Sequence, residues 1–317
     1  MLIVVPLAAV VFFSIFKRMA GQVATSRDWH SVTLSPGFPR SLKQPSGKDI
    51  TIAALPVRIV AANCGAADIL QELIDPKRFA AVPVQVEEYA VDPQFWKNHA
   101  GIPRFEKFQA ERILGYRPDL VVSSSFQDGS TAAAIEAQRV PILYLKDFEA
   151  LDGIRDTIAT VGKATGSEVA AAKIIAQFDA QLKTVAEALK ETKPVTVILY
   201  SNFGTGYTAG SGVCQNDIIT RAGGINLAAQ HGMKGHVPLT FEQLLRMDPD
   251  YIVVSGNDGL DSPQAKVVLS ESSLKELRAV KNRHIAVVPS RYLIALSQHA
   301  VEAVKSVARQ LHPEAKL

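Results

Sequence analysis

The sequence of 317 residues has few cysteines and lacks several short motifs that mark common enzymes. Its two thiols, Cys64 and Cys214, are too few for a disulfide framework or a four-cysteine zinc site. No GxxxxGKS/T, HExxH, CxxC or GxSxG motif occurs. These absences exclude phosphate-loop ATP binding, a zinc peptidase of the HExxH type, a dithiol centre and the nucleophile elbow of α/β-hydrolases.

Charge of one sign is not in excess either, because 34 Lys and Arg residues face 31 Asp and Glu residues. A formal net charge of +3 without a basic run is too small to indicate a nucleic-acid partner. Charged residues make up 21% and hydrophobic residues 47% of the chain, which is typical of a globular protein. The length is sufficient for about two domains of ordinary size.

The N-terminus has a composition unlike the rest of the chain. Residues 2–16 are uncharged and are followed by Lys17 and Arg18. This run is shorter than the roughly 20 residues that span a bilayer, but it has the length of a signal-peptide core, about 7 to 15 residues. No positive charge precedes it, and no clear small-x-small cleavage site follows. We therefore expect residues 1–24 to be a signal peptide or a membrane anchor that places the rest outside the cytoplasm.

An internal duplication is the main organising feature of the sequence. Residues 111–123 read ERILGYRPDLVVS, and residues 242–255 read EQLLRMDPDYIVVS. In both, a glutamate and an apolar pair are followed by Pro-Asp and then by a β-branched apolar run. This pattern predicts a short helix that ends before the proline, followed by a buried parallel strand. The large offset between the copies indicates two similar lobes rather than a short-period repeat protein.

A long helical tract lies between the two copies. Its second part, from Ser167 to about Lys190, has apolar residues close to a 3.6-residue period, and Ser167 is a candidate N-cap. We expect an α/β fold of two Rossmann-like lobes with parallel sheets, joined by one long inter-lobe helix. The expected division is an N-terminal leader or edge segment, an N-terminal lobe, an inter-lobe helical linker and a C-terminal lobe, at residues 25–56, 57–149, 150–193 and 194–317.

A glycine-rich loop follows the first strand of the second lobe. Residues 204–209 match GxGxxA, but Gly210 and Gly212 prolong the loop, so the dinucleotide reading is weak. Ligands of open α/β sheets bind beyond the carboxyl ends of the strands. Tyr207 in this loop therefore either stacks on a ligand or caps its own lobe.

The sequence leaves the roles of the cysteines and histidines open. Cys64 and Cys214 each follow the first strand of a lobe and come just before a helix, where the helix N-terminus lowers a thiol pKa. The alternative is two small, semi-buried side chains. His231 and His236 flank a glycine-containing loop, but their spacing is not one recognised for metal ligands.

Taken in order, several segments resemble the helical-backbone periplasmic substrate-binding proteins of ABC importers for iron–siderophore complexes, haem and cobalamin. The similarity covers about residues 48–314 and follows GKDITI, PVRIV, the two Glu-to-Pro-Asp repeats, AGGIN and LHPE, at residues 47–52, 56–60, 111–122, 242–250, 222–226 and 311–314. The resemblance implies two α/β lobes joined by a long helix, which agrees with the architecture expected from the patterns.

The resemblance also implies site residues and partners. One glutamate of each lobe, at the positions of Glu111 and Glu242, docks on permease arginines in that family. Loops between the lobes hold the ligand, which implies contacts from Arg104, Phe105, Tyr207, His236, Arg291 and Tyr292. Because arginine pairs with anionic oxygens and stacks on rings, Arg104, Tyr207, Arg291 and Tyr292 favour an iron–siderophore complex. Cobalamin comes second, because the cobalamin binders of this family carry aromatic residues at both of the positions that hold Phe105 and His236 here. The loop at residues 101–110 has no tyrosine, which disfavours haem.

The resulting hypothesis is an exported binding protein without catalysis, resident cofactor or metal ligands of its own. It would act as a monomer, capture a metal chelate and deliver it to an ABC permease, with no nucleic-acid partner. The alternative is a two-lobed α/β metalloenzyme with a site built from Cys64, Cys214 and His236. A sensor or adhesin that keeps the binding fold without feeding a transporter is a third reading.

Overall fold

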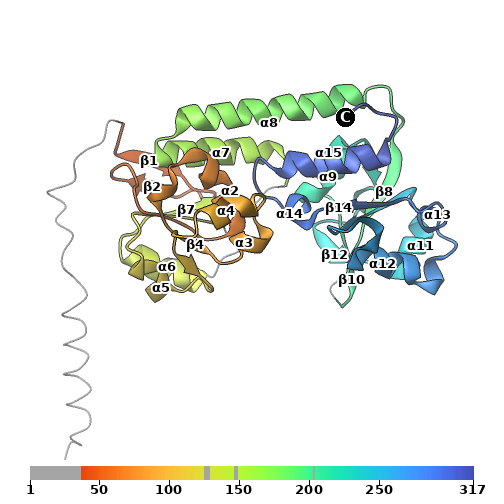
Figure 1. Cartoon of the computed structure of the whole chain (residues 1–317), viewed down its shortest axis with the longest axis horizontal. Coiled ribbons are helices and arrows are strands. Elements are labelled where there is room, and N and C mark those ends of the chain that lie inside the picture. The colour runs from red at the N-terminus through yellow and green to blue at the C-terminus, as the bar shows by residue number, and fades with distance from the viewer. Residues whose placement is uncertain (1–36, 125–128, 146–148, 203) are drawn as a thin grey trace, which may run out of the picture.

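The computed structural model describes residues 37–124, 129–145, 149–202 and 204–317. These residues form two lobes, each built on a parallel sheet, and a long helix runs along one side of both (Figure 1). The sheet of the first lobe has the strand order β5-β4-β3-β6-β7, and that of the second has β11-β8-β13-β14. The predicted α/β fold with parallel sheets in two lobes is confirmed.

The N-terminal lobe alternates short strands with helices. Its strands are β3 (Ile59–Ala61), β4 (Phe79–Pro83), β5 (Arg104–Phe105), β6 (Leu120–Ser124) and β7 (Ile142–Leu145). Its helices are α2 (Cys64–Leu73), the 3-10 helix η2 (Pro76–Arg78), α3 (Val86–Tyr89), α4 (Pro93–Asn98), α5 (Ala110–Gly115) and α6 (Gly129–Ala137). The strands β3, β4 and β6 are entirely buried, as expected for a parallel sheet covered on both faces.

The C-terminal lobe adds a small antiparallel sheet to its parallel one. The parallel strands are β8 (Val195–Leu199), β11 (Gly224–Asn226), β13 (Tyr251–Ser255) and β14 (Ile285–Val288), and the antiparallel ones are β9 (Ser201–Asn202), β10 (Gly206–Ala209) and β12 (His236–Pro238). The helices are α9 (Cys214–Arg221), α10 (Leu227–Gln230), α11 (Phe241–Met247), η3 (Gly259–Asp261), α12 (Pro263–Ser270), η4 (Ser272–Leu274), α13 (Arg278–Lys281), α14 (Ser290–Leu293) and α15 (Ala300–Leu311).

The described part of the expected leader is an antiparallel hairpin on the N-terminal lobe, formed by β1 (Arg40–Lys43) and β2 (Asp49–Ile52). In the hairpin turn, the Gln44 side-chain amide pairs with the edge strand β7 as a neighbouring strand would. Its Nε2 donates to Ile142 O at 2.6 Å, and its Oε1 accepts from Tyr144 N at 3.0 Å. Sequence reasoning missed this hairpin because its polar and Pro/Gly-rich composition is typical of loops.

The two sequence repeats have the same local structure, which explains their Pro-Asp pairs. The Asp119 carboxylate accepts the backbone N–H groups of Val57 and Arg58, each at 2.9 Å, just before β3. The Asp250 carboxylate accepts the N–H of Thr196 at 2.9 Å and its hydroxyl at 2.6 Å, at the start of β8. Each aspartate therefore ties its own strand to the central strand of its lobe.

The repeats also share an uncommon backbone geometry. Arg117 and Asp248, two residues before these aspartates, have φ values of 50° and 41°. Arg139 and Arg283, which lie shortly before β7 and β14, have φ values of 59° and 55°. L-residues rarely adopt this left-handed region because their Cβ approaches the backbone. Each lobe thus has two tight turns, in front of corresponding strands.

The inter-lobe tract is a pair of packed helices, α7 (Asp152–Thr165) and α8 (Glu168–Ala188), of which α8 has 21 residues. They come together closely, since a Cβ on Gly162 would lie 2.5 Å from the Ala171 Cβ. Gly166 ends α7 with a left-handed φ of 69°. Ser167 occupies the N-cap position of α8 as predicted, but its side chain makes no capping hydrogen bond.

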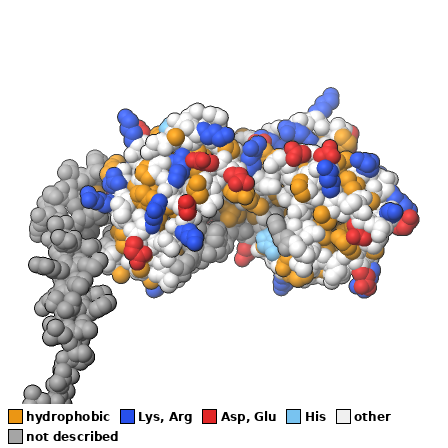
Figure 2. Space-filling view, turned by 60° about the horizontal axis from the view of Figure 1, so that its bottom comes forward, with side chains coloured by type: hydrophobic (Ala, Val, Ile, Leu, Met, Phe, Trp, Pro, Cys, Tyr) orange, Lys and Arg blue, Asp and Glu red, His pale blue; other side chains and the backbone are white. Residues whose placement is uncertain are grey.

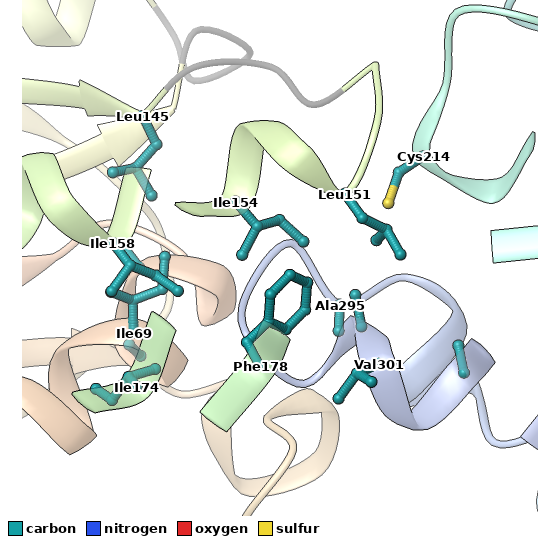
Figure 3. Packing of buried hydrophobic residues seen from close by; sticks show 14 of the residues in the cluster. Ile69, Leu145, Leu151, Ile154, Ile158, Ile174, Phe178, Cys214, Ala295 and Val301 are labelled. Carbon is teal, nitrogen blue, oxygen red and sulfur yellow. The ribbon is translucent and has the colours of Figure 1, made fainter. Parts of the chain in front are cut away.

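One apolar core continues across the boundary between the lobes. The helix α8 packs on α7 and α2 of the first lobe and on α15 and α9 of the second. Figure 3 shows Phe178 of α8 surrounded by Ile154 and Leu151 from the first lobe's side of the chain and by Ala295 and Val301 from the second lobe. All five side chains are at most 6% exposed. Since close-packed interiors resist deformation, this core limits relative movement of the lobes.

The N-terminal residues 1–24, for which we expect a signal peptide or an anchor, lie outside the described residues. Among the residues that are described, no helix combines the length and the apolarity needed to cross a membrane.

Candidate functional site

The carboxyl ends of strands from both sheets come together where the lobes meet. After β3, the Asn63 side chain caps α2 by accepting from Ala66 N at 2.9 Å. After β14, the chain enters α14, and then reaches Leu296. A Cβ on Gly65 of α2 would lie only 3.4 Å from the Leu296 Cβ, so the lobes touch here. Figure 2 shows apolar side chains gathered at this junction. Such strand ends are the usual ligand sites of parallel sheets.

Two predicted ligand residues, Tyr207 and His236, lie on one face of the small antiparallel sheet. In the register of β10 and β12, Tyr207 faces Pro238 and Ala209 faces His236. Because opposed and alternate residues share a face, both side chains project from the same side. Both are exposed. The structure therefore brings this aromatic ring and this imidazole together at a surface open to solvent.

Arg291 and Tyr292 are adjacent on α14, directly after β14. The guanidinium carbon of Arg291 lies 5.4 Å from the centroid of the Tyr292 ring. The Arg291 Nε is buried and has no hydrogen-bond partner among the described residues. An unpaired buried guanidinium nitrogen is costly, and an anionic or carbonyl oxygen of a ligand would satisfy it.

Arg104 and Phe105 form β5 at the edge of the N-terminal sheet, and both make contacts within their own lobe. The Arg104 guanidinium donates to the carbonyl oxygens of Ile102 and, at 2.9 Å, of Trp96, and its Nε lies 3.3 Å from a carboxylate oxygen of Glu87. The Phe105 ring is 2% exposed in the lobe's core. A direct ligand contact by either side chain requires these internal contacts to be given up, and their binding role stays a prediction.

Three exposed apolar side chains at strand ends escaped the sequence reasoning. Val84 and Tyr89 follow β4 in the first lobe, and Ile294 follows α14 in the second; their exposed fractions are 38%, 46% and 54%. Large apolar side chains left open beside a lobe junction are typical of binding sites. A signal existed for Val84, because it directly follows a wholly apolar strand, but Pro83 weakened the strand assignment.

The two glutamates predicted to dock on a permease, Glu111 and Glu242, occupy matching positions on the two lobes. Glu111 lies in the first turn of α5 and Glu242 in the first turn of α11, and both are exposed. A carboxylate in the first helical turn is favoured by the helix dipole. Glu242 also faces Arg246 on the same helix at 3.5 Å. Figure 1 shows α5 and α11 on different lobes, both apart from α8.

The cysteines do not form a reactive or metal-binding site. Burial, with a smaller contribution from Asp68, raises the pKa of the Cys64 thiol to about 12. Burial likewise raises the pKa of Cys214 to about 12, and that thiol packs beside Leu151 (Figure 3). Desolvation therefore outweighs the helix N-terminus, and both thiols stay protonated.

His231 makes a contact within its own segment of the chain. The His231 Nδ1 lies 2.8 Å from Leu227 O within its own turn. Among the residues described, no three His, Cys, Asp or Glu side chains are placed to hold a metal ion.

The glycine-rich loop is used for close packing rather than for a dinucleotide. Gly206 to Ala209 form the strand β10, so no helix begins at the GxGxxA match. A Cβ on Gly206 would lie 2.4 Å from Leu239 O, and one on Gly210 would lie 2.1 Å from Met233 O. These glycines let β10 approach neighbouring backbone closely.

The arrangement agrees with known proteins. The sequence profile of the periplasmic binding protein family matches residues 59–292. The chain belongs to this family. A cobalamin-binding protein of Halobacterium salinarum is 26% identical over 277 residues, covering 87% of this chain and 74% of that protein. An uncharacterised ABC transporter substrate-binding lipoprotein of Bacillus subtilis, YvrC, is 22% identical over 320 residues, covering 97% and 96%.

Solved structures confirm the two-lobed fold. The periplasmic heme-binding protein RhuT from Roseiflexus sp. RS-1, in apo form, superposes with a TM-score of 0.70. It is 24% identical, and the match covers 82% of this chain and 99% of that one. The Cys/His metalloenzyme considered from the sequence is not supported, because the chain belongs to a family of binding proteins and desolvation raises the pKa of the half-buried Cys64 and of the buried Cys214 to about 12.

Proposed function

We propose that this protein is the extracytoplasmic substrate-binding protein of an ABC importer, and that it carries a metal chelate between its lobes to a permease. One observation carries this function: in a member of the periplasmic binding family, strand ends of two parallel sheets meet at one junction bordered by open aromatic and apolar side chains. The protein contributes binding and delivery, and no group in the described site is activated for catalysis.

The ligand contacts follow from which side chains are free. Tyr207 and His236 offer a ring and an imidazole from the small sheet, and Arg291 with Tyr292 offers a guanidinium with an unpaired nitrogen. Val84, Tyr89 and Ile294 supply apolar surface on both sides of the junction. This combination fits a bulky chelate that has anionic or carbonyl oxygens on an otherwise apolar body.

Two chelates are supported by different observations. Cobalamin is supported by the cobalamin-binding relative, whose similarity extends over 87% of this chain. A ferric siderophore is supported by the unpaired Arg291 nitrogen beside an aromatic ring, because such complexes present anionic oxygens. Both are cargo, and no resident cofactor is proposed.

Calorimetric titration of the purified protein with cobalamin and with ferric catecholate and hydroxamate siderophores tests the function. Saturable one-to-one binding of one chelate supports it, and no binding of any metal chelate would overturn it. Arg291→Gln should weaken binding of an anionic chelate by about tenfold or more, whereas Arg246→Gln, on α11 away from the junction, should not.

Glu111 and Glu242 are proposed to contact arginines of the permease. Exposed carboxylates on both lobes can set the register of such a complex without touching the ligand. In a reconstituted transporter, Glu111→Ala with Glu242→Ala should abolish uptake while chelate affinity is unchanged. The matched control is Asp49→Ala with Glu276→Ala, which also removes one exposed carboxylate from each lobe. If uptake persists in Glu111→Ala with Glu242→Ala, this docking mode is excluded. A sensor or adhesin would then be the better hypothesis.

The proposed setting is outside the cytoplasm, reached through the N-terminal segment at residues 1–24, with the protein acting as a monomer. Sedimentation of the purified protein and mass analysis of its mature N-terminus test these two points.

A further inference from the structure

A compact polar contact joins the lobes beside the ligand site. Gln298 and His299, just before α15, meet Asp68 and Glu72 on α2. The Gln298 Nε2 lies 2.9 Å from Asp68 O and 2.7 Å from Glu72 Oε1. The His299 Nε2 lies 3.0 Å from the same Glu72 oxygen. We call these four residues the α2 contact.

The α2 contact has more acceptors than donors. The two hydrogens of the Gln298 amide nitrogen are used by Asp68 O and Glu72 Oε1, and His299 Nε2, 3.2 Å from the same nitrogen, donates to Glu72. The Gln298 Oε1 is buried and has no partner among the described residues. The Asp68 carboxyl is 2% exposed and accepts one hydrogen bond, from Val91 N at 3.1 Å. A buried ionised carboxylate normally needs more donors than this, or a cation beside it.

The surrounding charges act on the Asp68 carboxyl in both directions, because Glu72 and Asp92 raise its pKa and His299 lowers it. The charged groups that act on Asp68 are Glu72 on its own helix, Asp92 at the start of α4 and His299 from the other lobe. From α7 and α8, which also pack on α2, the side chains near Ile69 are the apolar Ile158 and Ile174 (Figure 3). Burial is the main cause that raises the pKa of Asp68 to about 7, while the Val91 N–H and His299 lower it.

We propose that the α2 contact binds a proton when the lobes are held as in this structure, so that protonation favours the lobes in contact and deprotonation favours their separation. The link is Gln298, which belongs to the C-terminal lobe and covers the turn of α2 that contains Asp68. Separation admits water to the carboxyl, which then ionises more easily. Because Asp68 also binds the Val91 amide, the change reaches the segment that follows the exposed Tyr89.

The distance between the lobes can be measured in the protein without a bound chelate. Nitroxide labels at Lys97→Cys and Lys275→Cys, exposed sites on different lobes, are introduced with Cys64→Ala and Cys214→Ala. Electron–electron resonance then gives the inter-lobe distance distribution from pH 5.5 to 8.5. We expect a longer or broader distribution at alkaline pH, with a midpoint near pH 7 and at most about a tenfold change in the ratio of states per pH unit.

Two variants distinguish protonation of Asp68 from a general effect of pH on the fold. Asp68→Asn removes the titrating carboxyl, keeps its shape and should give the same distribution at every pH. The control Glu106→Gln, an exposed acid of the same lobe, should titrate as the parent does. In the unlabelled protein, the nitrogen chemical shift of the Val91 amide should follow the same midpoint. A parent distribution and a Val91 shift that do not change with pH would overturn the proposal, as would full pH dependence in Asp68→Asn.

Discussion

The backbone N–H of Leu151 donates a hydrogen bond of 2.8 Å to the Oδ2 atom of Asp217, and this bond joins the two lobes. Leu151 directly precedes α7 and is fully buried, while Asp217 lies in the first turn of α9. Arg221 bridges the same carboxylate at 2.9 Å and Asp152 at 3.0 Å. The lobes are therefore fastened on this side as well as at the α2 contact, with the shared apolar core between them.

Asp217→Ala should lower the free energy of unfolding by about 1–3 kcal/mol, because it leaves the buried Leu151 N–H without an acceptor. Asp217→Asn keeps an acceptor oxygen and loses only the charge beside Arg221, so its loss should be smaller. Urea unfolding of both variants measures the difference. Equal losses would mean that the charge of Asp217 beside Arg221, and not the bond to Leu151, accounts for its contribution to stability.

Arg139 and Arg283, which have positive φ values, should tolerate glycine better than valine. Arg139 and Arg283 have exposed side chains, so their main contribution at these turns is the backbone geometry. Arg139→Gly and Arg283→Gly should leave stability unchanged or raise it by up to about 1 kcal/mol, because glycine adopts this φ without a steric cost. Arg139→Val should lower it, since a β-branched side chain is more strained there. Thermal unfolding distinguishes these outcomes, and valine behaving like glycine would contradict the strain.

The stability of the protein should depend on pH through Asp68. Its pKa is raised to about 7 in the folded state from an ordinary value of 3.8, so the folded protein binds the extra proton. This contribution is complete below about pH 4 and is lost as pH rises to 7, by up to about 4 kcal/mol. Asp68→Asn should remove this loss, so the variant gains on the parent between pH 4 and 7. Denaturant unfolding at several pH values measures it.

Glu72 contributes in the opposite direction and in another pH range. Burial raises the pKa of the Glu72 carboxyl, but the hydrogen bonds from His299 and Gln298 together lower it by more than burial raises it. The pKa therefore lies below the ordinary value of 4.5. Its stabilisation is present at neutral pH and is lost on acidification through that lowered pKa. Because Glu72 is present in both proteins, the assignment to Asp68 is tested by the difference in stability between Asp68→Asn and the parent, and a difference that does not change between pH 4 and 7 would contradict it.

The cysteines should be dispensable for chelate binding. Cys64→Ala with Cys214→Ala should keep the affinity, because both thiols are protonated and neither belongs, among the described residues, to a group of three side chains that could hold a metal ion. Cys214→Ser should be the more destabilising change at that position, since it buries a hydroxyl in an apolar core. Calorimetry measures the affinity, and thermal unfolding measures the stability. A loss of binding in the double alanine variant would contradict the prediction and would support a thiol-based site.

Much of the fold could be predicted from the sequence because its signals are local. The two Glu-to-Pro-Asp repeats place α5, β6, α11 and β13 correctly, since proline and β-branched runs act on the nearest residues. The hairpin at Arg40–Ile52 was missed because it depends on the pairing of Gln44 with β7, about 100 residues away in the chain.

The candidate site was less predictable for the same reason. The patterns located Tyr207 in a loop beside the strand ends, but nothing local shows that Arg104 is held by Trp96 O and Glu87, or that Phe105 is buried. The exposure of Tyr89 and Ile294 depends on how two separate lobes meet. Side-chain direction and contacts between lobes are set by tertiary packing, which leaves no periodic trace in the sequence.

Neither parallel sheet borrows a strand from the other lobe, and this has a consequence for how the chain is made. All five strands of the first sheet are complete by Leu145, before any residue of the second sheet begins at Val195. During synthesis or transport from the N-terminus, the first lobe can pair its whole sheet while the second is still absent. The side of α8 that faces the second lobe then stays uncovered until α9 and, later in the chain, α15 pack against it. Truncation within α15 should therefore yield a chain with two formed sheets and an exposed apolar seam, which is prone to aggregate.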